Sequence, residues 1–283
     1  METSVLNTNG IESYRVPLYV NYKPALPVPE RLVFIGIGID HFADTKYNLS
    51  WSVKDIRDLA GKLRAKYTTG IAIDTLFNEK VTRENVLALK RRLNTLSEND
   101  KVIIAYAGHG LFNKDGDYFL STYLTNFRKP EEKGLPYSDL ENLLDGIRPR
   151  KKLMLIDACN SGEVDKEFIK AMRKKGNTAM DNGAELLNQQ KSFELMQELF
   201  ANVGRSTGAT VLTASAGTQF ALETNELKNG VFTYCILEAM EQHKTMKVSE
   251  LKQIVRKRVF EITKGMQQPA FRNETGMSDW NIW

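Results

Sequence analysis

The sequence is poor in cysteine and histidine. Its 283 residues include two cysteines, Cys159 and Cys235, and three histidines. Two cysteines are too few for a disulfide framework, and no spacing pairs them, so we expect a reducing compartment in which a thiol stays available for chemistry. Three histidines without close ligand spacing argue against a zinc site, and we expect no metal site.

The sequence also lacks long apolar runs and a strong excess of charge. No stretch of about 18 apolar residues occurs, so we expect no membrane span. The N-terminus does not have the basic-then-apolar layout of a signal peptide, which favours a cytoplasmic location. The net charge is +4, from 39 basic and 35 acidic residues. No Lys/Arg block stands beside interleaved aromatic residues, so we expect no nucleic-acid partner.

Strand patterns alternate with helix patterns along the chain. Apolar, β-branched runs predict strands at 31–39, 101–107, 152–158 and 209–214, with a small edge piece at 118–121, and a further short apolar run covers 71–77. Apolar stripes predict helices at 51–67, from Thr82 to Leu96, from Ser138 to Ile147, and at 231–240 and 248–262. These repeated units predict an α/β fold with a mainly parallel sheet and helices on both faces.

The chain divides into an N-terminal arm and one domain. Residues 1–30 are polar and then proline-spaced, which predicts an extended arm, a linker or the remnant of a larger protein. The alternation covers residues 31–283, except for a stretch from 160 to about 206 that lacks it.

Two predicted strands end in residues that carry chemistry. KVIIAYA runs into GHG (108–110), and KLMLIDA runs into CNSG (159–162). The ends of adjacent parallel strands lie close together, and a thiol beside an imidazole forms a nucleophilic thiolate near neutral pH. The flanking glycines leave amide N–H groups exposed, which an oxyanion hole requires. The sequence predicts Cys159 as nucleophile, His109 as base, and the N–H groups of Gly110 and Cys159 as oxyanion donors.

The two boxes YAGHG and DACNSG place the histidine and the cysteine 50 residues apart. They resemble the His and Cys boxes of the caspase-like peptidases, which include caspases, metacaspases and bacterial orthocaspases. The later segments TASAGTQFALE and GVFTYCILEAM are similar to the small-subunit half of that family. The resemblance implies the caspase-hemoglobinase fold, with about six strands. It divides the domain into a large-subunit-like part (31–160), an intersubunit loop region (161–206) and a small-subunit-like part (207–283).

The residues near Cys159 suggest which bond is cleaved. Asp157 stands where caspases have Gln, and a carboxylate beside the pocket repels a substrate aspartate and attracts Arg or Lys. Metacaspases also have an aspartate there and a second one on the helix after the first strand, which Asp55 matches, with Asp58 as the fallback. Ser215 matches the position where the family pairs with the substrate backbone. The resemblance therefore implies cleavage after Arg or Lys.

The resemblance also raises expectations about the pocket, calcium, self-cleavage and biological role. Metacaspases commonly have Ser where this chain has Ala107, which leaves the detail of the pocket open. The chemistry needs no cofactor, and calcium activation stays open because no dense acidic cluster indicates it. The basic residues Arg173, Lys174 and Lys175 suit the expected specificity, so we hypothesise self-cleavage after one of them. The resemblance implies a protein or peptide substrate, an activating partner or missing domain, and a bacterial cell-death or defence role.

Several residues have simpler interpretations. Cys235 lies within a predicted helix and is expected in the core, and His41 and His243 have no partner motif. The alternative for Asp157 is a structural role at the strand end, and that for Asp55 is a solvated carboxylate on a helix face. The basic residues at 173–175 have the alternative of a solvated loop.

Two rival functions stay open. One is a catalytically silent caspase-like domain that acts as a scaffold or regulator. The other is a redox thiol protein or nucleotide binder on a doubly wound sheet. Against it, the chain has no CxxC, and the GxG at Gly36 and Gly38 lacks the third glycine of a dinucleotide-binding loop.

Overall fold

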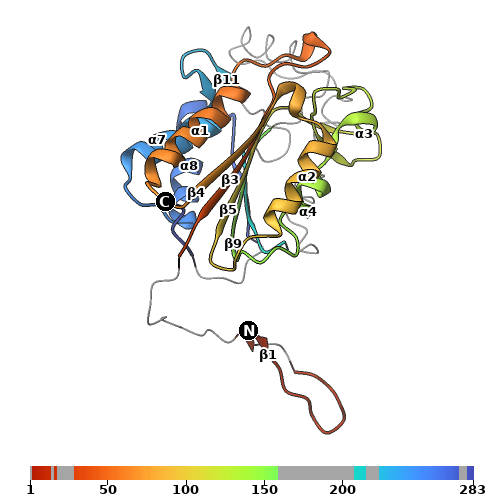
Figure 1. Ribbon diagram of the computed structural model, residues 1–283, viewed down its shortest axis with the longest axis vertical. Helices are drawn as coiled ribbons and strands as arrows, with labels where there is room; N and C mark the ends of the chain where they lie inside the picture. The colour runs from red at the N-terminus through yellow and green to blue at the C-terminus, as the bar shows by residue number, and fades with distance from the viewer. Residues whose placement is uncertain (1, 14–15, 18–28, 159–206, 215–222, 274–278) are drawn as a thin grey trace.

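A six-stranded sheet forms the centre of the fold. The computed structural model describes residues 2–13, 16–17, 29–158, 207–214, 223–273 and 279–283. The sheet has the strand order β13-β10-β9-β5-β3-β4, and all neighbours are parallel except β10 and β13 (Figure 1). The strands are β3 (Leu32–Gly38), β4 (Ile71–Phe77), β5 (Lys101–Ala107), β9 (Lys151–Asp157), β10 (Thr210–Thr213) and β13 (Ala270–Asn273). The predicted α/β fold with a mainly parallel sheet is confirmed.

Helices cover both faces of this sheet (Figure 1). One face carries α1 (Ser52–Lys66), α7 (Val231–Gln242) and α8 (Val248–Thr263), and the other carries α2 (Arg83–Leu93) and α4 (Tyr137–Asn142). Successive residues of β3 belong to opposite cores: Leu32 and Phe34 pack in the first, and Val33 and Ile35 in the second. Because side chains alternate along a strand, a strand buried on both faces reads as a continuous apolar run.

Short elements complete the described part of the chain. A three-stranded sheet joins β6 (Gly110–Phe112), β7 (Tyr118–Leu120) and β8 (Leu135–Pro136), and a hairpin pairs β11 (Glu223–Thr224) with β12 (Asn229–Gly230). The remaining pieces are η1 (Thr45–Tyr47), η2 (Asn78–Lys80) and α3 (Pro130–Lys133). Within the expected N-terminal arm, β1 (Glu2–Thr3) pairs with β2 (Val16–Pro17).

The helix ends test the capping arguments. Thr82 caps α2 as predicted, since its side chain accepts from the Asn85 N–H. The helix predicted from Ser138 to Ile147 is wrong in length: α4 begins at Tyr137 and ends at Asn142. The apolar residues beyond it are buried in turns instead, and Gly146, with φ of 63°, allows the chain to turn toward β9.

A search for helices able to cross a membrane found none among the described residues.

Candidate active site

His109 follows β5 at the carboxyl edge of the sheet. Ala107, the last residue of β5, pairs with Asp157, the last residue of β9, and the Gly108 N–H donates to the Asp157 carbonyl oxygen at 3.2 Å. A Cβ atom at Gly108 would lie 2.6 Å from the Tyr106 hydroxyl oxygen and 2.7 Å from Ile39 Cγ2. The close approach therefore requires glycine between the strand and His109.

A backbone carbonyl orients the His109 ring. His109 Nε2 lies 2.8 Å from the carbonyl oxygen of Tyr47, the last residue of η1. Because a carbonyl only accepts, we assign the proton of the neutral ring to Nε2 and the lone pair to Nδ1. Nδ1 is therefore the ring nitrogen that takes up a proton in acid–base chemistry.

Aromatic rings and backbone hydrogen bonds fix His109 further. The ring centroids of Phe42 and Phe127 each lie 5.3 Å from that of His109, and Phe127 stacks on Tyr47 at 3.6 Å. The His109 N–H donates to Ser121 Oγ at 3.1 Å. The side chain is half-buried, which leaves it accessible beside an apolar wall.

Two buried carboxylates lie at the neighbouring strand end. Asp157 ends β9 and is 9% exposed, and Asp55 lies in the first turn of α1 and is 1% exposed. We call these two residues the carboxylate pair. A Cβ atom built on Gly230 would lie 2.6 Å from Asp157 Oδ2 and 3.1 Å from Asp55 Oδ2, so the pair flanks one backbone position.

β12 and the first turn of α7, which follows it directly, supply hydrogen-bond donors to the pair. Asp157 Oδ2 accepts from Thr233, from its N–H at 3.2 Å and its hydroxyl at 2.6 Å. Asp55 Oδ1 accepts from Asn229 Nδ2 at 2.7 Å, and the Gly230 N–H lies 3.2 and 3.1 Å from the two Asp55 oxygens. Both carboxylates are thus held from the same short segment.

Burial raises the pKa of both carboxyl groups of the pair. Burial raises the pKa of Asp55 well above its ordinary value, and the charge of Asp157 raises it further, against the hydrogen bonds from Asn229 and Gly230. Burial likewise raises the pKa of Asp157 to about 6, although the hydrogen bonds from Thr233 lower it. Two adjacent, poorly hydrated carboxylates favour a cation as their partner.

Glu223 adds a third negative group to this region. Its carboxylate accepts from the N–H groups of Ser50 and Trp51, at 3.1 and 3.3 Å, just before α1. Burial raises the pKa of Glu223, and its charge in turn raises the pKa of both members of the carboxylate pair. This residue ends the segment TASAGTQFALE, for which the family resemblance implied no such role, and it reaches α1 from a hairpin more than 150 positions later.

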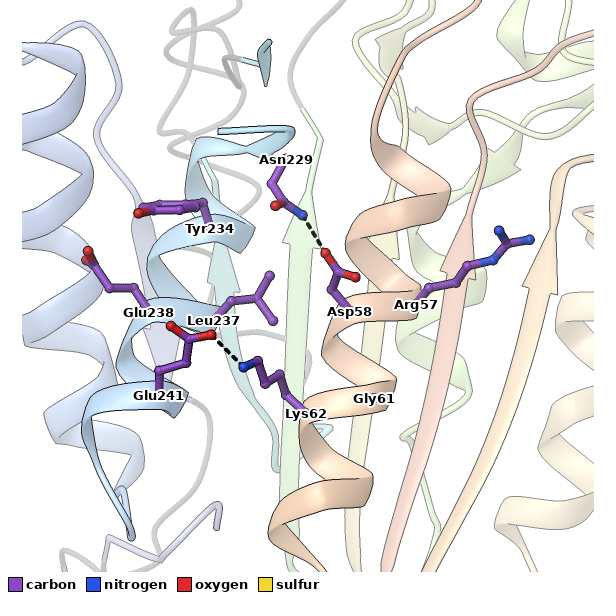
Figure 2. Close-up of a pocket in the computed structure, with 9 residues that line it drawn as sticks. All are labelled: Arg57, Asp58, Gly61, Lys62, Asn229, Tyr234, Leu237, Glu238 and Glu241. Atoms are coloured by element: carbon purple, nitrogen blue, oxygen red, sulfur yellow. Dashed lines mark hydrogen bonds and ion pairs between the residues drawn. The ribbon is translucent and has the colours of Figure 1, made fainter. Parts of the chain in front are cut away.

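Asp58, the fallback for Asp55, lies on a more open side of α1. Its side chain is 36% exposed and forms an ion pair with Lys54. It borders a groove of about 410 Å³ between α1 and α7, where Asn229 points toward Asp58 and Lys62 toward Glu241 (Figure 2). Of the two carboxylates, the structure brings Asp55 beside Asp157.

Several predicted site residues lie outside the described residues. These are Cys159, Ser215 and the cluster Arg173, Lys174 and Lys175. Gly110 is described and begins β6, one residue after His109.

The other histidines and the second cysteine occupy different surroundings. Cys235 is fully buried in α7, and burial raises the pKa of its thiol to about 12, as expected for a core residue. His41 is exposed, and its Nδ1 lies 2.5 Å from Asp40 Oδ1. Within the described ranges, no group of three or more His, Cys, Asp or Glu side chains is arranged to hold a metal ion.

Sequence reasoning missed the residues that support the site. Tyr47, Phe42 and Phe127 contact His109 from loops without a motif. Gly230 and Thr233 stand in the segment GVFTYCILEAM, which is similar to the small-subunit half of the family but was assigned no site role from the sequence.

Comparisons with known proteins agree with this architecture. The family model described as the caspase domain matches residues 32–277. A search of curated proteins found no match. Among solved structures, the protein GSU0716 from Geobacter sulfurreducens is similar in fold, with 17% sequence identity and a TM-score of 0.58, over 88% of this chain and 95% of that one. The chain therefore belongs to the caspase-domain family of the cysteine peptidase superfamily.

Proposed function

We propose that this chain is a cysteine endopeptidase that cleaves proteins or peptides after Arg or Lys. The observation that carries the proposal is the carboxylate pair, of which Asp157 ends β9, two residues before Cys159 in the sequence. A guanidinium bound by two carboxylates forms directed, charge-assisted hydrogen bonds, and a lysine ammonium is a compact alternative. A substrate aspartate would be repelled by the same groups.

The register of the sheet supports a dyad of His109 and Cys159. In the pairing of β5 with β9, Ala107 is opposite Asp157, an offset of 50 residues. The sequence separation between His109 and Cys159 is the same. Adjacent parallel strands therefore lead toward the two residues from matched positions.

The proposed reaction proceeds through an acyl-enzyme. The Cys159 thiol loses its proton to His109 Nδ1, and the thiolate sulfur attacks the peptide carbonyl carbon. The N–H groups of Gly110 and Cys159 donate to the oxyanion. The carbon–nitrogen bond breaks as the imidazolium returns its proton to the leaving amine. Water then hydrolyses the thioester with His109 as base, so the chemistry requires no cofactor.

The direct test is cleavage of fluorogenic peptides that differ only at the residue before the scissile bond. We expect turnover with Arg or Lys and none with Asp, and no turnover by Cys159→Ala. Parallel assays with and without calcium ask whether an activating ion is needed. Turnover after Asp, or turnover that survives in Cys159→Ala, contradicts the proposal.

Self-processing follows from the same specificity. We propose cleavage after Arg173, Lys174 or Lys175, in the region between the large- and small-subunit-like halves. Active enzyme incubated alone is expected to yield two fragments, and Cys159→Ala is expected to stay intact. A variant with all three residues changed to Ala should lose this cleavage but keep peptide turnover; an intact wild-type chain contradicts the hypothesis.

The biological setting is proposed on the family resemblance alone. The chain would act on a protein substrate in a bacterial cell-death or defence pathway, with an activating partner or a further domain. Mass spectrometry of new protein termini in cells that express the wild-type chain or Cys159→Ala tests this. New termini after Arg or Lys that appear only with the wild-type chain are expected.

A further inference from the structure

Residues outside the carboxylate pair hold its two side chains in place. Asp55 comes from α1 and Asp157 from β9, whereas the donors that fix both come from β12 and the first turn of α7. We propose that Asn229, Gly230 and Thr233 are positioning residues that build the cation-binding pocket, a role that rests on the proposed Arg/Lys specificity.

Thr233 sets the orientation of Asp157. Both of its donors, the N–H and the hydroxyl, bind the same carboxylate oxygen, Oδ2. One oxygen of Asp157 is thereby used for positioning, and we assign contact with a bound cation to the other, Oδ1. The threonine side chain is 2% exposed, so this hydroxyl is committed to the interior. Hydrogen bonds to the ionised form also favour it over the protonated form.

Gly230 sets how closely the two carboxylates approach. Its φ is −61°, so the backbone does not require glycine for conformational reasons. Glycine is required here for steric reasons, because a Cβ atom would lie 2.6 Å from Asp157 Oδ2 and 3.1 Å from Asp55 Oδ2. Any side chain at this position pushes the pair apart.

Asn229 connects the pair with the outer side of α1. Its Nδ2 donates to Asp55 at 2.7 Å and to Asp58 at 3.2 Å, and its Oδ1 accepts from Lys54 at 3.2 Å. Figure 2 shows the bond to Asp58 across the space between α1 and α7. The amide thus donates and accepts at once, which a carboxylate of the same shape cannot do.

These contacts join two parts of the chain that are far apart in the sequence. Glu223 and Gly230 are opposite each other in the β11–β12 hairpin, and both bind the first turn of α1 or the residues just before it. The pocket is therefore assembled from both halves of the domain, with acids from the large-subunit-like half and donors from the small-subunit-like half.

The test uses agmatine, a guanidinium compound without a scissile bond, bound to the intact chain and followed by calorimetry across pH. Thr233→Val keeps the shape but removes the hydroxyl, and we expect agmatine binding to weaken about tenfold, as for the loss of a hydrogen bond to a charged group. The pH at which binding is half lost should move upward. Thr233→Ser should restore both values.

Glycine variants give the matched comparison. Gly230→Ala should weaken agmatine binding at least about tenfold, because the pair is displaced. Gly61→Ala in α1 is the control, since its added Cβ atom meets nothing within 4 Å, and it should bind as the wild type does. If Gly230→Ala does not fold, the Thr233 variants carry the test alone.

The outcomes separate the two proposals. Wild type that binds agmatine, together with Thr233→Val that binds equally well and with the same pH midpoint, overturns the positioning role and leaves the Arg/Lys specificity standing. Wild type that does not bind agmatine overturns the specificity, and the positioning role with it.

Discussion

The ends of β5 and β9 are neighbours in the sheet but have opposite chemical surroundings. At the end of β5, a carbonyl oxygen and aromatic rings hold His109. At the end of β9, donors from β12 and the first turn of α7 hold two carboxylates. The first arrangement suits a ring that exchanges a proton, and the second suits a fixed negative charge. One edge of a parallel sheet thus holds the proposed reaction centre and the proposed recognition centre side by side.

Removal of the His109 imidazole tests the role of the β5 side and has the largest expected effect. His109→Ala should lower kcat by about 10²–10⁴-fold, the usual contribution of general acid–base catalysis. Agmatine binding should stay within about twofold of wild type, because the carboxylate pair is untouched. Rate measurements and calorimetry on the same preparation check both halves; a large loss of agmatine binding contradicts the separation of the two centres.

Neutralising Asp157 on the β9 side should change the recognition of substrate arginine rather than the chemical step. Asp157→Asn is expected to raise KM for peptides with Arg before the scissile bond by about 10–100-fold, since a charge-assisted partner is lost, with a smaller effect on kcat. Matched peptides with citrulline, which has the shape of arginine without its charge, should show little change. A fall in kcat alone, with KM unchanged for both peptides, would place Asp157 in the chemistry rather than in recognition.

The same substitution should stabilise the fold at neutral pH. Burial raises the pKa of Asp157 to about 6, so the ionised carboxylate opposes folding above that pH. We expect Asp157→Asn to raise the melting temperature at pH 7.5 by about 2–4 °C, the shift that about 1 kcal/mol gives a domain of this length. Calorimetric melting measures it, and a lower melting temperature of the variant would show that the charge stabilises the fold.

The pH dependence of stability and of binding should run in opposite directions. The stability that Asp157 contributes is fully present below its unfolded-state pKa of 3.8 and is lost as pH rises through about 6. Affinity for agmatine should increase over the same window, because binding needs the ionised form. The wild-type chain, compared with Asp157→Asn from pH 4 to pH 8, reports the titration of Asp157 together with its effect on the pKa of Asp55. A constant difference in melting temperature between the two would contradict the raised pKa.

The smallest expected effect concerns the aromatic wall of the β5 side. Phe127→Leu removes the ring that stacks on Tyr47, whose carbonyl orients His109. A lost aromatic pair of about 0.5–1.5 kcal/mol corresponds to a decrease in kcat of roughly 2–10-fold, with KM unchanged. Phe260→Leu, at a side chain that is 51% exposed, is the control. Equal kcat values for the two variants would show that Phe127 does not help to position His109.

Sequence reasoning predicted the parallel strands well, because a strand buried on both faces is a continuous apolar run bounded by polar residues. It missed β13, whose four residues AFRN have no such run and pair antiparallel with β10. It also missed the β11–β12 hairpin, in which each strand has two residues. Elements this short are fixed by tertiary contacts rather than by their own pattern.

The candidate site divides in the same way. His109, Asp55 and Asp157 stand in motifs or at strand ends, where sequence position carries chemical meaning. Tyr47 acts through its carbonyl, so its side-chain identity gives no signal. Glu223 acts on α1 across a large sequence separation, which only the folded chain reveals. Contacts of this kind are invisible to spacing arguments.

The central claim is that the carboxylate pair makes the pocket select a positive charge. It is tested most directly by the ratio of kcat/KM for two peptides that are identical except for arginine or citrulline before the scissile bond. We expect the wild-type chain to favour arginine by about 10²-fold or more and Asp157→Asn to lose most of that preference. Equal cleavage of both peptides by the wild-type chain, or a preference that survives in Asp157→Asn, would contradict the account.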